Sequence, residues 1–234
     1  MKLSTRGLNA WYGPAHILFN VDVALASGEV VALLGRNGAG KSTLFRSVMG
    51  LLARTSGEVQ LDDRPIQALE PYEIARRGIG YVPEDRRVFT ELTVEENLIV
   101  GQRPPRPDAP RWTPEQLYTI FPNLREMRRR PSGRMSGGEQ QMLTIARTLM
   151  GNPALVLLDE PSEGLAPRIV EQMASAILLM KTQGLGILVS EQNLHFARLI
   201  ADRAYIIEKG HIRFAGTMAE LTADPALKDA YLAL

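Results

Sequence analysis

The sequence contains no cysteine, which excludes disulfide bonds, thiolate metal sites and cysteine nucleophiles and is typical of a cytosolic protein. It also lacks any apolar run of about 18 residues, and its first residues include no apolar stretch of signal-peptide length. We therefore expect no membrane span and, at most, a peripheral membrane role. A strong charge of one sign is absent as well: the formal net charge is +1, so nothing indicates a nucleic-acid binder.

What is present is the composition of an ordinary globular domain, with 234 residues, of which 45% are hydrophobic and 23% charged. Short apolar segments at 30–34, 154–158 and 187–190 alternate with helical patterns, and this alternation predicts a parallel sheet covered on both faces. Residues 1–34 have the pattern of strands and turns, whereas residues 86–150 predict a mostly helical insertion. We expect one domain over 1–234 that contains this insertion.

A glycine-rich segment follows the apolar strand 30–34 and precedes a helical pattern. It reads Gly35-Arg36-Asn37-Gly38-Ala39-Gly40-Lys41-Ser42, with Thr43 next, and matches the phosphate-loop pattern G-x-x-x-x-G-K-[ST]. Glycines let backbone N–H groups close around phosphate oxygens, and the positive end of the next helix attracts the same anion. Lys41 is expected to contact the β- and γ-phosphates and Ser42 to hold Mg²⁺. The alternative is a glycine-rich turn that happens to precede a helix. If the segment is a phosphate loop, it indicates a nucleoside triphosphatase.

Two acids end the apolar strand 154–158. Asp159 is expected to reach Mg²⁺, and Glu160, which points differently, to polarise the attacking water. The alternative is that two acids simply mark the end of a strand.

A second candidate anion site begins at Ser136. Ser136 is a good helix N-cap with Glu139 three residues later, which is a capping box, and Gly137 and Gly138 leave backbone N–H groups bare at the helix start. The alternative is an ordinary capped helix.

Taken in order, the phosphate loop, the Ser-Gly-Gly segment and the Asp-Glu pair resemble the ATPase domain of ABC transporters across essentially the whole chain. The resemblance implies an α/β P-loop NTPase fold with a RecA-like core, an N-terminal antiparallel β region and a helical subdomain. It also implies ATP and Mg²⁺ as cofactors and a head-to-tail pair of ATPases. In that pair Ser136, Gly137 and Gly138 of one subunit contact the γ-phosphate held by the other, so half of each site comes from a partner.

Further matches concern the adenine and the partner subunit. Tyr12 lies where the family places an aromatic residue that stacks on adenine; Trp11 is an adjacent competitor, and packing is the alternative role for Tyr12. The segment 162–165 resembles the loop that contacts the opposite subunit.

Two positions depart from the family pattern. Glu84 stands where the family usually has a glutamine that links Mg²⁺ to the membrane subunit; a carboxylate can approach the metal but cannot donate a hydrogen bond. Gln192 stands where the family usually has a histidine that contacts the γ-phosphate, and its amide can donate but cannot carry charge. We expect His195, three residues on, at a helix surface rather than as a substitute.

The segments around these departures resemble the second ATPase subunit of bacterial importers for branched-chain amino acids, or related amides or urea. They include residues 81–84, 86–89, 92–98 and 191–193 and the closing Ala230-Tyr231-Leu232. The resemblance implies a second ATPase chain, two membrane permeases, indirectly a periplasmic binding protein, and a peripheral position on the cytoplasmic face of the inner membrane. The alternatives are another importer class, a lipid exporter, or an ABC ATPase without a transport role.

A basic run of Arg125, Arg128, Arg129, Arg130 and Arg134 precedes the Ser-Gly-Gly segment. It has the charge to face anionic lipid or nucleic acid, but with a net charge near zero we favour a solvated face.

Overall fold

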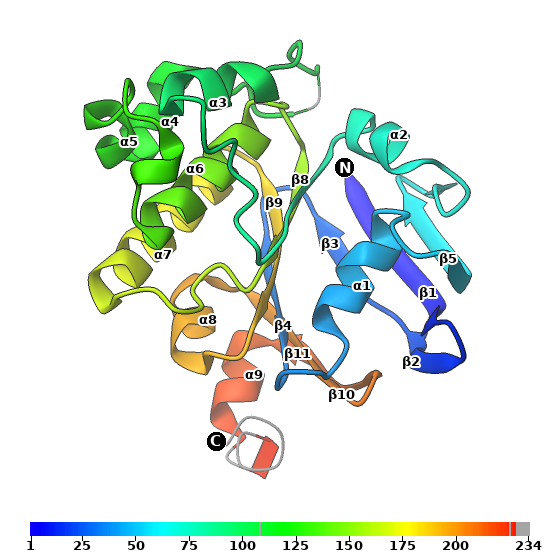
Figure 1. The fold of residues 1–234 in the computed structure, drawn as a ribbon. Helices are drawn as coiled ribbons and strands as arrows, with labels where there is room; N and C mark the ends of the chain where they lie inside the picture. Colours follow the sequence, from blue (N-terminus) through cyan, green and yellow to red (C-terminus); the bar gives the residue numbers. More distant parts are fainter. Residues whose placement is uncertain (108, 225, 228–234) are drawn as a thin grey trace.

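A mostly parallel sheet runs through the middle of the molecule, with one group of helices on one face and an antiparallel sheet on the other (Figure 1). The computed structural model describes residues 1–107, 109–224 and 226–227. The closing Ala230-Tyr231-Leu232, part of the resemblance, lies outside these residues. The two faces of the central sheet carry the two hydrophobic cores of the chain.

The central sheet has six strands in the order β11-β10-β4-β9-β8-β7. The strands are β4 (Val30–Leu34), β7 (Ile79–Val82), β8 (Leu155–Asp159), β9 (Gly186–Glu191), β10 (Arg203–Glu208) and β11 (His211–Thr217). Neighbours from β10 to β7 are parallel, and β11 is antiparallel to β10. Parallel neighbours need crossover connections, which the helices supply. The predicted parallel sheet is therefore confirmed.

The position of strand β4 between two hydrophobic cores explains why its sequence is uniformly apolar. Val30 and Ala32 pack in the core beneath the helices, whereas Val31 and Leu33 pack in the core shared with the N-terminal sheet. Both faces of the strand are covered, so alternation with polar residues is not needed.

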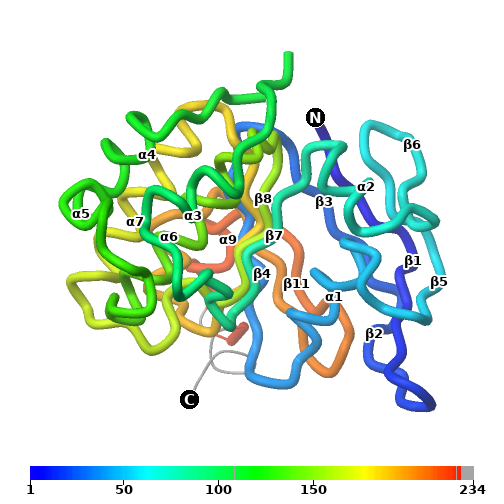
Figure 2. The backbone as a smooth tube through the Cα atoms, turned by 45° about the horizontal axis from the view of Figure 1, so that its top comes forward, coloured from blue at the N-terminus to red at the C-terminus, as the bar shows by residue number. Residues whose placement is uncertain are grey.

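The helices lie mainly in the second half of the chain. They are α1 (Lys41–Val48), α2 (Pro71–Arg76), α3 (Val94–Gly101), α4 (Pro114–Ile120), α5 (Pro122–Glu126), the 3₁₀ turn η1 (Ser132–Arg134), α6 (Gly137–Leu149), α7 (Pro167–Thr182), α8 (Leu194–Ile200) and α9 (Met218–Ala223). The segment 86–150 contains α3 to α6, so it is mostly helical as expected. Figure 2 shows that these helices lie together on one side of the molecule. Among the described residues, no helix combines the length and apolar character needed to cross a membrane.

The N-terminal sheet is antiparallel, as expected. Its central strand β1 (Lys2–Tyr12) pairs with β2 (Ala15–Val21), β3 (Ala24–Ala26) and β5 (Arg54–Leu61), and β6 (Arg64–Pro65) extends β5. Helix α1 packs between this sheet and the central sheet through its apolar side chains.

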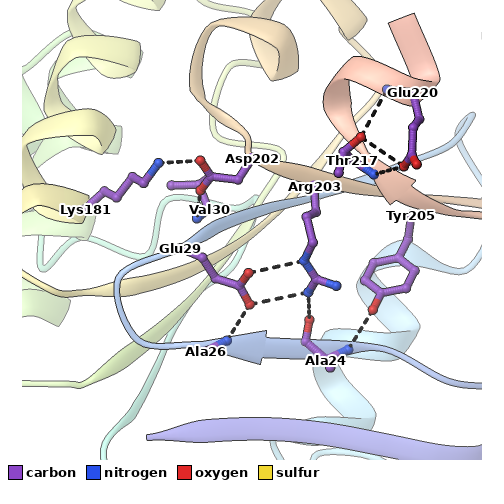
Figure 3. Close-up of polar contacts among 10 residues, drawn as sticks. All are labelled: Ala24, Ala26, Glu29, Val30, Lys181, Asp202, Arg203, Tyr205, Thr217 and Glu220. Carbon is purple, nitrogen blue, oxygen red and sulfur yellow. Dashed lines mark hydrogen bonds and ion pairs between the residues drawn. The ribbon is translucent and has the colours of Figure 1, made fainter. Parts of the chain in front are cut away.

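The two sheets are also joined by a polar junction at the start of β10 (Figure 3). Arg203 Nε donates to Glu29 Oε2 over 3.2 Å, and its Nη2 donates to the Ala24 carbonyl of β3 over 2.9 Å. Beside it, Asp202 pairs with Lys181 of α7 at 2.5 Å. The junction therefore ties both sheets and one covering helix together at the edge opposite the phosphate loop, where β4 and β10 begin.

Candidate functional site

The phosphate loop, residues 35–42, joins the end of β4 to the start of α1. Gly38 and Gly40 have φ values of +77° and +112°, in the left-handed region that favours glycine. A Cβ atom at Gly40 would also lie 2.8 Å from the Leu18 side chain. The loop thus has the backbone shape its sequence predicts, with Arg36, Asn37 and Gly38 exposed, Ala39 buried, and Thr43 buried one residue beyond it.

Lys41 points back over this loop. Its side chain is 3% exposed, and Nζ donates to the carbonyls of Gly35 over 2.7 Å and Arg36 over 3.1 Å. Nζ also pairs with Glu160 Oε1 at 2.9 Å. A buried ammonium group is thereby held at the mouth of the loop, where it can neutralise an anion.

Asp159, the last residue of β8, is bound by three hydroxyl groups. Its Oδ1 accepts from Ser42 over 3.1 Å and from Ser190 over 2.7 Å, and its Oδ2 accepts from Tyr81 over 3.3 Å. Burial raises the pKa of Asp159, although these hydrogen bonds oppose the effect. The structure therefore brings together the two residues, Ser42 and Asp159, that the sequence predicts to share a metal.

Glu160 leaves the strand with a φ of +46°, which turns it away from the direction of Asp159. Gln192 Nε2 donates to Glu160 Oε2 over 3.1 Å and to Asn37 Oδ1 over 2.8 Å. Burial alone would raise the pKa of Glu160, but hydrogen bonds from Glu163, Lys41 and Gln192 hold it below its usual value. The carboxylate is thus kept ionised, as a general base requires.

Two further acids lie beside Glu160 and hold their protons more tightly. The hydrogen bond to Glu160 raises the pKa of Glu163 to about 7, and burial raises the pKa of Glu191 to about 7. Glu160, Glu163 and Glu191 line one cleft of about 450 Å³ together with Gln192. Groups that titrate near neutrality next to an ionised carboxylate are typical of sites that move protons.

The oxygen ligands in this site suit magnesium. Among the described residues, no group of three or more His, Cys, Asp or Glu side chains could hold a metal. The Ser42 hydroxyl and the buried Asp159 carboxylate meet at 3.1 Å, and an incoming cation would offset the cost of burying that carboxylate. Mg²⁺ is usually bound by one or two protein oxygens with substrate phosphates and water, so the residues present fit this ion.

The Ser-Gly-Gly segment, residues 136–138, opens α6 with the predicted capping box. Ser136 N–H donates to Glu139 Oε2 over 2.7 Å, and Glu139 N–H donates to Ser136 Oγ over 3.4 Å. Gly138 is buried, and a Cβ atom there would lie 2.9 Å from Ile169. Within the described residues, no hydrogen bond or ion pair joins this segment to the phosphate loop of the same chain. The two candidate phosphate-binding elements of one chain therefore share no direct polar contact among the described residues.

Trp11 and Tyr12, the two aromatic residues at the end of β1, differ in how much the rest of the chain contacts their rings. Trp11 stacks on His16 with ring centroids 4.3 Å apart, and Arg54 lies 4.6 Å from the centre of the same Trp11 ring. Tyr12 is 42% exposed, and its hydroxyl accepts from Arg46 over 3.4 Å. Of the two rings, Tyr12 is the one that is free to stack on a base.

The remaining candidates lie at the surface. Glu84 is exposed and, within the described part of the chain, has no side-chain hydrogen bond or ion pair, so the structure does not bring it to Ser42 or Asp159. His195 is exposed on α8, as expected. All five arginines of the basic run 125–134 are exposed, and the solvated face stays a prediction.

Sequence reasoning missed Tyr81 and Ser190 as site residues. Tyr81 and Ser190 bind Asp159 because β7 and β9 flank β8, which depends on the strand order rather than on any local pattern. The available signal was that both lie near the ends of predicted strands, where parallel strands gather their functional residues.

Comparison with known proteins identifies this site. Residues 18–163 match the family model described as ABC transporter. The chain belongs to the ABC transporter family. It is 42% identical to the high-affinity branched-chain amino acid transport ATP-binding protein BraG of Pseudomonas aeruginosa, over 98% of this chain and 99% of that protein. It is 39% identical to the probable branched-chain amino acid transport ATP-binding protein LivF of Archaeoglobus fulgidus, over 94% and 93% of the two chains.

A solved nucleotide-free ATP-binding cassette from an ABC transporter is similar to this ABC ATPase throughout, with a TM-score of 0.83 and 26% identity over 100% of both chains. The expected α/β P-loop NTPase fold is therefore confirmed, and the chain is an ATPase with a nucleotide-binding site.

Proposed function

We propose that this ABC ATPase powers the uptake of branched-chain amino acids or related small solutes across a membrane. The main support for this proposal is the 42% identity of the chain to BraG over nearly the full length of both proteins. The site described above supplies the groups that a transport ATPase needs: a phosphate loop, a hydroxyl–carboxylate pair for a metal, and an ionised acid.

Hydrolysis would proceed by in-line attack of water on the γ-phosphate of ATP. Glu160 would accept the proton of the attacking water, and Lys41 would neutralise the charge that develops on the phosphate. Gln192 would orient Glu160 through the amide hydrogen bond that it already donates. Ser42 and Asp159 would hold Mg²⁺, which would supply further neutralisation of the phosphate charge, and Glu84 would become a ligand only if its loop moved toward these residues.

A complete ATP site would require a second ATPase subunit, either another copy or a sister chain. Within the described residues, no hydrogen bond or ion pair joins Ser136, Gly137 and Gly138 to this chain's own phosphate loop, which supports that requirement. ATP binding would close the pair and hydrolysis would let it reopen. Tyr12 would stack on the adenine.

The closing motion would drive two membrane permeases, fed by a periplasmic solute-binding protein, with the ATPases at the cytoplasmic face of the inner membrane. Exposed apolar side chains support a docked partner: Tyr72 of α2 is 58% exposed and Phe89 48% exposed. Tyr72 also borders a cleft of about 790 Å³ between α2, β7 and the loop after α3. Exposed aromatic groups beside a cleft are typical of protein-binding surfaces.

The test is affinity purification of the tagged chain from native membranes, followed by mass spectrometry and by uptake of radiolabelled leucine in cells with and without the gene. We expect two permeases and a second ATPase to co-purify and leucine uptake to depend on the chain. Recovery of lipid-export components, or of ribosomal or nucleic-acid partners without a permease, would overturn the importer assignment and leave the ATPase chemistry intact.

A further inference from the structure

Arg86 occupies an unusual place in the loop between β7 and α3. Its backbone adopts the left-handed region with φ +50°, and its side chain is partly buried. The guanidinium group lies directly against Gly137, because a Cβ atom added to that glycine would overlap Arg86 Nη1. The side chain therefore covers the first turn of α6, next to the bare N–H groups of the Ser-Gly-Gly segment.

The other contacts of Arg86 fix its position but leave its charge unpaired. Nη2 donates to the Glu163 carbonyl over 3.4 Å, and the Arg86 carbonyl accepts from Thr144 Oγ1 of α6 over 3.1 Å. No carboxylate forms an ion pair with Arg86 within residues 1–107, 109–224 and 226–227. By contrast, the adjacent Arg87 pairs with Asp85 at 2.8 Å.

The arrangement places a further positive charge at the start of α6. Helix α6 spans 13 residues, and its N-terminus carries the positive end of the helix dipole, which Glu139 of the first turn partly offsets through its capping contact with Ser136. Arg86 itself forms no ion pair within the described residues, so an anion would be attracted by the guanidinium and by the helix N–H groups together. The planar fork of an arginine also matches the oxygens of a phosphate group.

We propose that Arg86 binds the terminal phosphate of the ATP that the partner ATPase presents to Ser136, Gly137 and Gly138 of this chain. The inference rests on the proposed pairing of two ATPases, though not on the identity of the transported solute. Arg86 is then a nucleotide-binding residue supplied in trans, and the hydrogen bond to Glu163 and the left-handed backbone hold it ready at the interface.

The experiment measures ATP-dependent association of this chain with its partner ATPase, self or sister, in a Glu160→Gln background that slows hydrolysis. Sedimentation of the two subunits is followed against ATP concentration for Arg86→Ala, Arg86→Lys and the matched control Arg87→Ala. ATP affinity of the isolated subunit is measured in parallel, because each chain's own phosphate loop is untouched. Inorganic phosphate replaces ATP in a separate arm.

We expect Arg86→Ala to raise the ATP concentration needed for association at least about tenfold, with Arg86→Lys intermediate and Arg87→Ala unchanged. ATP affinity of the isolated subunit should stay within about twofold, and phosphate alone should not drive association. Equal effects of Arg86→Ala and Arg87→Ala, a matching loss of ATP affinity in the isolated subunit, or association driven by phosphate alone would each overturn the inference. So would a lack of ATP-dependent association in the parent variant. Failure of the importer assignment would appear only in the purification and uptake experiment, so the two failures are distinguishable.

Discussion

The side-chain amide of Gln192 donates a hydrogen bond to Glu160 over 3.1 Å. The same Nε2 donates to Asn37 Oδ1 in the phosphate loop over 2.8 Å, so one neutral side chain joins the candidate base to the nucleotide loop. An amide has the same charge at every physiological pH, whereas the histidine usual at this position in the family titrates near pH 6.5.

Two substitutions of Gln192 should distinguish the effect of its hydrogen bond on activity from the effect of its neutral charge. We expect Gln192→Ala to lower the ATPase rate about tenfold, because Glu160 loses a donor that orients it. Gln192→His should keep activity but add a titration around pH 6.5 to the pH dependence that Glu163 and Glu191 give the wild type. Steady-state rates from about pH 5.5 to about pH 8.5 check both. An unchanged rate for Gln192→Ala would remove Gln192 from the site.

Glu160→Gln should bind ATP but hydrolyse it about 10²–10⁴-fold more slowly, because the amide cannot accept the proton of the attacking water. Binding should persist, since the substitution frees Lys41 from its 2.9 Å ion pair. Nucleotide titration and phosphate release measure the two effects separately. Glu171→Gln, which changes an exposed acid of the same cleft, is the matched control and should leave the rate unchanged. Near-normal turnover of Glu160→Gln would show that another group acts as the base.

The two rings at the end of β1 offer a direct comparison. Tyr12→Ala should weaken ATP binding by about 1–3 kcal/mol, the usual contribution of stacking between a base and an aromatic ring. Trp11→Ala should change binding little, because His16 and Arg54 already contact that ring. Equilibrium binding of a fluorescent ATP analogue tests both variants. A larger loss for Trp11→Ala would reverse the assignment.

Local patterns predicted those parts of the site that are built from consecutive residues. The loop 35–42 and the capping box of Ser136 and Glu139 each carry their geometry in adjacent positions, and both form as expected. Strands β4 and β8 of the central sheet are recognisable in the sequence because burial on both faces removes nearly all polar residues from them.

Contacts across the sheet could not be predicted in this way. Asp159 lies opposite Ser190 because β8 pairs with β9 in one register, and β9 lies between β8 and β4. The placement of Arg86 on Gly137 depends on how residues 86–150 fold back on the core. The left-handed backbone at position 86 could not be predicted either, because the residue there is not a glycine. Strand order and side-chain direction are set by packing of the whole chain rather than by a motif.

The junction between the sheets should contribute more to stability than an ordinary surface ion pair. Arg203 joins Glu29 and the Ala24 carbonyl, and Figure 3 shows this group. Arg213, by contrast, pairs with the single carboxylate of Glu208 at 3.3 Å among the described residues. We expect Arg203→Ala to lower the free energy of unfolding by about 1–2 kcal/mol and Arg213→Ala by less than about 0.5 kcal/mol. Urea denaturation measures both, and equal losses would mean that the junction adds nothing beyond a surface pair.

Glu191 should make the stability of the nucleotide-free protein depend on pH. Burial raises its pKa from an ordinary value of 4.5 to about 7, so the folded state holds a proton that the unfolded state releases. The resulting stabilisation is complete below about pH 4.5 and is lost as the pH rises through 7. For this 2%-exposed residue the loss should be about 3 kcal/mol.

Glu191→Gln removes the titrating group, so the prediction concerns the difference between wild type and variant. The free energy of unfolding of the wild type, minus that of Glu191→Gln, should fall steadily between about pH 4.5 and about pH 8. Urea denaturation at intervals across that range measures it, and Glu171→Gln should show no such fall because Glu171 is exposed. A constant difference between wild type and Glu191→Gln would mean that Glu191 titrates as an ordinary surface acid. The neutral titration in this cleft would then belong to Glu163, the other acid whose pKa lies at about 7.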